Sequence, residues 1–130
     1  MIGTVMITLA TILATAAIGG IVTGVWHYFS AFIQETMKSI TKKLKKLPNV
    51  TFAGIKCFLK KTWGTIKEII RAYKFYKDRN EWEIETIIRK VPKNKVEEEI
   101  PADIRAKVER EHGLEHDVTE NVELKLKRCA

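Results

Sequence analysis

The first 34 residues of the chain contain no Asp, Glu, Lys or Arg, and the first formal charge is Glu35. The hydrocarbon core of a bilayer takes about 20 residues of α-helix, so this uncharged stretch is long enough to cross a membrane. No basic residue precedes the apolar run, and the run exceeds the roughly 7–15 apolar residues of a secretory signal peptide. The sequence therefore predicts a transmembrane helix over residues 1–34.

The sequence also lacks the motifs of common catalytic sites. It contains no GxGxxG, no GxSxG and no HExxH. The two cysteines, Cys57 and Cys129, have no motif spacing. His112 and His116 are four residues apart, but Gly113 interrupts the helix between them and nothing completes a set of three or four metal ligands. We therefore expect a protein that is not an enzyme, with no catalytic residues, no metal and no cofactor.

Charge is distributed unevenly along the chain. Residues 1–79 carry 13 Lys and Arg against 3 Asp and Glu, whereas residues 80–130 carry 10 against 13. A basic region beside a membrane segment indicates contact with anionic lipid head groups. Lysines favour the inner side of a membrane, so we expect the N-terminus outside and the C-terminus on the cytoplasmic or matrix side. The residues predicted at the membrane surface are Lys38, Lys42, Lys43, Lys45, Lys46, Lys56 and Lys60.

Two faces of the predicted span carry small or hydroxylated residues. Small residues let helices approach closely in lipid, where packing drives association. The residues predicted to pack on other helices are Ala10, Ala14, Ala17, Gly20 and Gly24. Threonine hydroxyls can bond between helices or line a water-filled pore. The stripe predicted to do so consists of Thr4, Thr8, Thr11 and Thr15.

Aromatic residues lie near the end of the predicted span, and a helical periodicity continues after it. Trp26 and Tyr28 are predicted anchors at the membrane interface, because amphipathic rings favour that position. The apolar spacing continues to Pro48, so we expect the span to extend into a basic stalk. Residues 51–79 show a further apolar stripe and many charges, which predicts an amphipathic helix that lies on the membrane or packs on protein.

The last 50 residues have a different pattern. Apolar residues alternate over 82–88, which predicts a strand, and 92–95 is typical of a turn. Residues 101–112 are predicted to form a short helix ended by Gly113, and a second strand is expected from Val118 onward. The sequence thus predicts a small β-α-β tail.

The predicted fold class is therefore mainly α. It comprises a single N-terminal transmembrane helix over 1–34, a basic juxtamembrane helical region over 35–79 with stalk and amphipathic helix, and a small α+β tail over 80–130. The expected function is that of a non-catalytic single-pass membrane protein, a structural or accessory subunit or an oligomeric scaffold. Its expected partners are a bilayer with anionic head groups and, in addition, further copies of itself, other membrane-protein subunits, or both.

Two further hypotheses belong to other classes of function. The threonine stripe is consistent with a membrane-permeabilising protein of the pore, holin or toxin kind. The lysines and aromatic residues of 38–79 are consistent with a membrane-tethered nucleic-acid binder. Nucleic acid is the less favoured partner, because a nearby span already explains the lysines.

Overall fold

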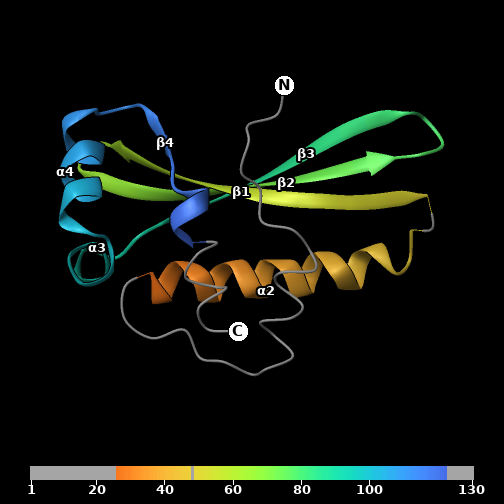
Figure 1. Cartoon of the computed structure of the whole chain (residues 1–130), viewed down its shortest axis with the longest axis horizontal. Helices are drawn as coiled ribbons and strands as arrows, with labels where there is room; N and C mark the ends of the chain where they lie inside the picture. Colours follow the sequence, from red (N-terminus) through yellow and green to blue (C-terminus); the bar gives the residue numbers. More distant parts are fainter. Residues whose placement is uncertain (1–25, 48, 123–130) are drawn as a thin grey trace.

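The computed structural model describes residues 26–47 and 49–122. The elements in chain order are helix α2 (His27–Leu44), strands β1 (Val50–Thr62), β2 (Thr65–Tyr76) and β3 (Glu81–Lys90), helices α3 (Lys93–Glu99) and α4 (Ala102–Arg110), and strand β4 (Glu115–Asp117). The strands form one antiparallel sheet in the order β3-β2-β1-β4. Helix α2 runs along one face of this sheet, whereas α3 and α4 lie together at one end (Figure 1).

This mixed α/β architecture shows that the predicted mainly α fold is wrong. The amphipathic helix predicted over 51–79 is instead the hairpin of β1 and β2, whose residues pair from Val50 with Tyr76 to Thr62 with Thr65. The two central turn residues, Trp63 and Gly64, have φ values of 51° and 77°. Positive φ at both positions is typical of the type I′ turn that closes two-residue hairpins.

The hairpin resembled a helix in sequence because both faces of its strands carry apolar side chains. Ile55 and Leu59 on β1 and Ile70 on β2 point into the core. Phe58 and Ile69 pair with each other on the opposite face. Strand residues alternate between faces with a period of two. Apolar residues on both faces hide that alternation and leave spacings that also fit a helix.

The predicted continuous helix through the span and stalk is also wrong. Trp26 has φ 68° and ψ 8°, a left-handed conformation that separates α2 from the residues before it. Instead of forming a projecting stalk, α2 packs on the sheet through Phe29, Ile33, Met37 and Ile40, which are at most 3% exposed. Their spacing of four, four and three residues forms one helical stripe. Residues 26–34 of the predicted span therefore belong to the folded core.

The C-terminal tail predicted as a separate β-α-β unit is part of the same sheet. The predicted strand over 82–88 is confirmed as β3, and the predicted helix over 101–112 is confirmed as α4, with Gly113 at φ 85° shortly after it. However, β3 and β4 occupy opposite edges of the sheet. Helix α3 overlaps the predicted turn, and β4 ends at Asp117, before the predicted second strand.

Packing between α2 and the sheet forms the core. The sheet contributes buried residues that share the face toward α2, and these are Ile55, Cys57, Leu59, Ile66, Ile70 and Ala72. Val96, Ile100 and Val108 extend the same core toward α3 and α4. Among residues 26–47 and 49–122, no helix combines the length and apolar composition that a membrane span requires.

Candidate interaction surface

Strand β3 presents an exposed row of mainly apolar side chains. Trp82, Ile84 and Ile88 are 54%, 53% and 57% exposed, and Thr86 is also exposed. Even-numbered residues of one strand point to the same side of a sheet. We call this row of Trp82, Ile84, Thr86 and Ile88 the β3 surface. Large exposed apolar side chains on one surface typically mark an interaction site.

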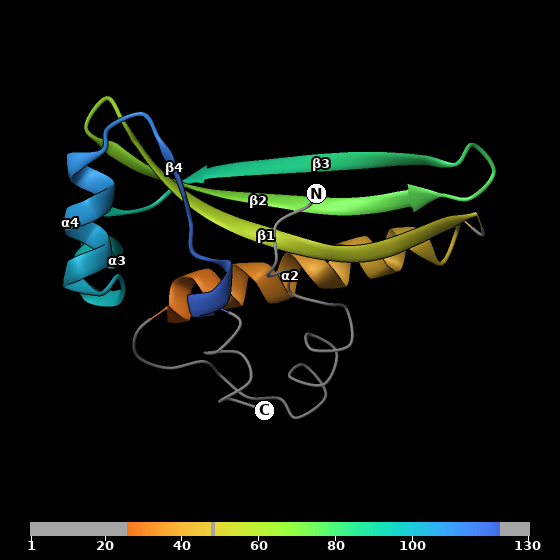
Figure 2. The ribbon, with the colours of Figure 1, turned by 45° about the horizontal axis from the view of Figure 1, so that its top comes forward.

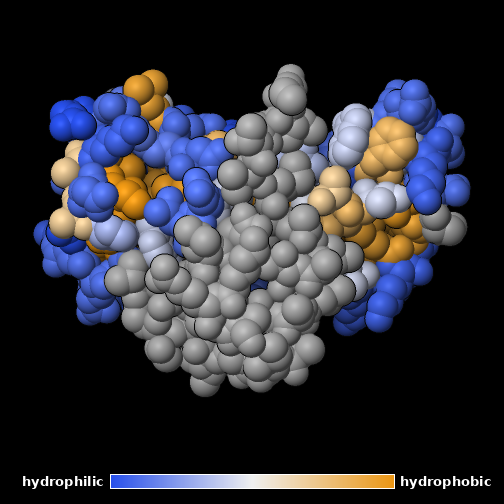
Figure 3. All heavy atoms as spheres, in the orientation of Figure 1, coloured by the Kyte–Doolittle hydropathy of each residue, from blue (hydrophilic) through white to orange (hydrophobic). Residues whose placement is uncertain are grey.

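The position of β3 at the edge of the sheet makes this surface accessible. In Figure 2, β3 lies at the outer edge of the sheet, with β2 between it and β1. The β3 surface continues onto β2, because Trp82 pairs with Phe75 and Ile84 pairs with Tyr73. The rings of Trp82 and Phe75 have centroids 5.2 Å apart. Figure 3 shows hydrophobic residues at the end of the sheet that carries the β2–β3 turn.

The opposite face of β3 is fixed by ion pairs. Lys74 Nζ lies 2.5 Å from Glu85 Oε2, and Arg89 Nε donates to Glu68 Oε1 at 2.7 Å. The hydrogen bond from Lys74 lowers the pKa of Glu85 below its usual value. These contacts hold β3 against β2, so the exposed row is presented by a strand with a fixed orientation.

Glu68 lies in a buried charge cluster beneath the start of α2. Its side chain is 1% exposed, and burial raises its pKa to about 7 although Arg89 opposes this effect. The Arg89 guanidinium lies 3.8 Å from the ring centroid of Tyr28 and 3.6 Å from that of Phe32. It also donates to the carbonyl oxygen of Tyr28 at 3.0 Å. Tyr28, predicted as a membrane-interface anchor, therefore covers this ion pair and is half-buried.

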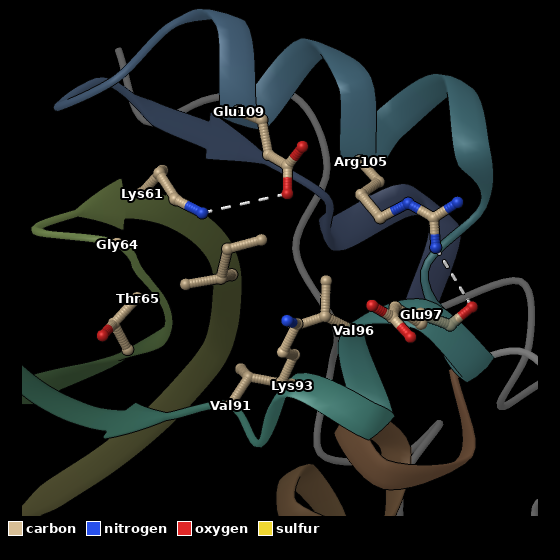
Figure 4. Close-up of a pocket in the computed structure, with 10 residues that line it drawn as sticks. Lys61, Gly64, Thr65, Val91, Lys93, Val96, Glu97, Arg105 and Glu109 are labelled. Atoms are coloured by element: carbon tan, nitrogen blue, oxygen red, sulfur yellow. Dashed lines mark hydrogen bonds and ion pairs between the residues drawn. The ribbon is translucent and has the colours of Figure 1, made fainter.

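A cleft lies at the other end of the described part of the molecule, between the β1–β2 turn, α3 and α4 (Figure 4). Its volume is about 820 Å³, and Ile66, Val91 and Val96 provide its apolar lining. Two basic side chains at its rim, Lys61 and Arg105, have partners within the protein. Lys61 Nζ lies 3.8 Å from Glu109 Oε1, and Arg105 Nη1 donates to the carbonyl oxygen of Glu97 at 3.1 Å. These pairs connect the turn and the two helices.

The structure places the predicted surface lysines in two groups. Lys38, Lys42 and Lys43 are exposed on α2, and Lys45 and Lys46 are exposed just after it. In contrast, Lys56 is 7% exposed and Lys60 is half-buried, both on β1.

Most of the other predicted site residues lie outside the residues that the structure describes. Trp26, the second predicted anchor, is 4% exposed in the core. The small residues Ala10, Ala14, Ala17, Gly20 and Gly24 lie outside the described residues, as does the stripe of Thr4, Thr8, Thr11 and Thr15.

His112 and His116 both follow the end of α4, so they do not share a helix. His112 is exposed after the helix, whereas His116 lies on β4 with Nε2 3.4 Å from Glu111 Oε2. Within the part of the chain that the structure describes, no three His, Cys, Asp or Glu side chains gather to hold a metal ion.

Two features of the site were not identified from the sequence. The strand over 82–88 was predicted, and its alternation of Trp82, Ile84 and Ile88 with glutamates indicated one apolar face, but nothing local showed that this face is uncovered. The pairing of Glu68 with Arg89 joins residues 21 positions apart, so only the strand register reveals it.

Comparison with family models, with curated proteins and with solved structures finds no match. What the protein does must therefore be inferred from its own surfaces.

Proposed function

We propose that the protein is a non-catalytic, membrane-anchored accessory or scaffold subunit that binds another protein chain through the β3 surface. The observation that carries this proposal is the exposed row on an edge strand, where Trp82, Ile84 and Ile88 are each more than half exposed. Covering these side chains removes apolar surface from water, which stabilises a complex. The unpaired backbone groups of an edge strand add hydrogen bonds to such a contact.

The membrane anchor in this proposal is shorter than the sequence suggested. Residues 26–34 are part of the folded core, which leaves residues 1–25 as the anchor. This stretch carries no charged side chain and exceeds the length of about 20 residues that a helical span requires. The exposed lysines of α2 and the turn after it then provide a basic surface for anionic lipid head groups on the inner side.

A nucleic-acid partner has less support from the same geometry. Stacking on bases requires exposed aromatic faces next to free cationic groups. Tyr73 is 9% exposed and Lys56 is 7% exposed, although both lie on the sheet face that carries the β3 surface. We therefore favour a protein partner.

The test compares the assembly state of the full chain with that of a variant whose β3 surface is polar. We expect the wild-type chain, extracted in mild detergent, to run as a complex larger than its 14.9 kDa by native mass spectrometry. W82T/I84T/I88T should reduce it to the monomer, because threonine keeps strand preference but removes most of the apolar surface.

Leu114 provides the matched control for this experiment. It is 57% exposed and lies outside the β3 surface. L114T should leave the complex intact. A wild-type chain that is monomeric in native membranes and in detergent, with no bound protein, would contradict the proposed function.

A further inference from the structure

We infer that the partner on the β3 surface is a second copy of this chain, with the two β3 strands paired antiparallel about a twofold axis at Thr86. This inference rests on the proposed function and names the partner of the same surface. Three features of β3 support it: a regular edge, complementary charge along the strand, and an apolar pattern that matches its own reverse.

The outer edge of β3 is long and regular. Its ten residues pair with β2 one to one, from Lys67 with Lys90 to Tyr76 with Glu81, without a bulge. No proline interrupts it. Proteins usually protect exposed edges by shortening, bulges or proline. The other edge of the sheet follows this rule, because β4 has only three residues.

Charge along β3 favours the antiparallel orientation. Acidic residues occupy its first half, at Glu81, Glu83 and Glu85, whereas Arg89 and Lys90 occupy its end. Antiparallel pairing of two copies places the acidic half of one strand beside the basic end of the other. Parallel pairing would place like charges together, which destabilises a strand pair.

The apolar residues then select the register. With Thr86 opposite Thr86, each Ile84 faces Ile88 of the other copy, and each Trp82 faces Lys90. Aliphatic pairs and cation–π contacts are both favourable across strands. Shifting one β3 strand by two residues in one direction places Glu85 opposite Glu85 of the other copy. Shifting it by two residues in the other direction places Ile84 opposite Lys90 of the other copy. A slip of one residue turns the apolar row of one copy to the wrong face.

This register joins the two sheets into one. The strand order becomes β4-β1-β2-β3 followed by the same strands of the second copy in reverse. The β3 surfaces of the two copies meet side by side on one face. Such an interface is isologous, so it closes as a dimer without extending into a filament.

The test maps the register by cysteine cross-linking in the full chain. The background carries C129S, and Cys57 is retained because it is only 1% exposed. Cα atoms of directly opposed residues in antiparallel strands lie about 4.5–5.5 Å apart, which falls within the range of about 4.4–6.8 Å that a disulfide spans. T86C should therefore oxidise to a species with twice the 14.9 kDa monomer mass.

Two matched variants distinguish the register from general proximity. I84C alone should not form the doubled species, because two copies of residue 84 are four positions out of register. A mixture of I84C and I88C chains should form it, because those residues face each other. Circular dichroism of each variant checks that the fold is retained.

Each outcome bears on a different statement. Cross-linking by T86C and by the mixture, with I84C alone unreactive, supports the inferred dimer. A chain that remains in a complex in detergent while T86C stays unlinked overturns the twofold β3 pairing and leaves the proposed function standing. A monomer with no bound protein overturns both.

Discussion

At the scale of single residues, Glu68 is the most unusual group in the described part of the chain. A carboxyl group that is 1% exposed loses its hydration, and this raises its pKa to about 7. Arg89 offsets part of that effect through a hydrogen bond at 2.7 Å. The consequence is a group that changes charge near neutral pH inside the contact between α2 and the sheet.

Glu68 should make the stability of the protein depend on pH. Its pKa is about 7 in the folded protein and about 4.5 in the unfolded chain, so the folded state holds the extra proton between these values. Its contribution is fully present below pH 4.5 and is lost as the pH rises through 7, a change of about 3 kcal/mol. E68Q should remove this loss, so the variant gains stability relative to wild type between pH 5 and pH 8 in urea unfolding.

Glu85 serves as a control with the opposite sign. Its pKa is lowered by the hydrogen bond from Lys74, so its contribution is present at neutral pH and is lost in acid. E85Q should be less stable than wild type at pH 7, and this difference should shrink toward low pH. If the free energies of unfolding of E68Q and wild type changed with pH in the same way, Glu68 would not be buried as described.

At the scale of elements, the sequence was most informative where one face of an element is clearly polar. Two elements were predicted correctly for this reason. The strand over 82–88 alternates glutamates with apolar residues. The helix over 101–112 has a few apolar positions among charged ones. The β1–β2 hairpin carries apolar residues on both faces, so its period of two was hidden. The Trp63-Gly64 turn is a local signal of the hairpin, but an isolated glycine is also tolerated within a helical pattern.

The type I′ turn should depend strongly on Gly64. Its φ of 77° is unfavourable for a residue with a Cβ, and no atom lies within 4 Å of where that Cβ would be. G64A should therefore destabilise the protein by about 1–2 kcal/mol through backbone strain alone. W63N should act in the opposite direction, because Asn-Gly is preferred at these positions. Thermal unfolding of the two variants measures both effects, and equal midpoints would contradict this description of the turn.

At the scale of the whole molecule, the exposed lysines lie farther from the proposed anchor than the linear sequence suggested. Lys42 lies 15 residues after His27 on α2, about 22 Å along the helix axis. The lysines that were predicted to lie at the membrane surface directly after the span are therefore distant from residue 25. Under the proposed function, these lysines would reach lipid head groups with α2 along the membrane surface and the sheet on the side away from the bilayer.

Residues 1–25 should determine where the protein is found. Removing them should move the chain from the membrane pellet to the supernatant after cell fractionation. Because the helix α2 and the four strands all lie within 27–117, the truncated chain should keep the mixed α/β signal in circular dichroism. A truncated chain that still pellets with membranes after a high-salt wash would contradict the assignment of the anchor.

The left-handed residue Trp26 has a mechanical consequence. Its backbone N–H donates to the carbonyl oxygen of Glu99 at 3.1 Å, and the N–H of Tyr28 donates to the Glu99 carboxylate. Glu99 is the last residue of α3. Tension applied through the N-terminal segment would therefore load the end of α3 through Glu99, and it would also reach β3, because the carbonyl oxygen of Tyr28 accepts a hydrogen bond from Arg89.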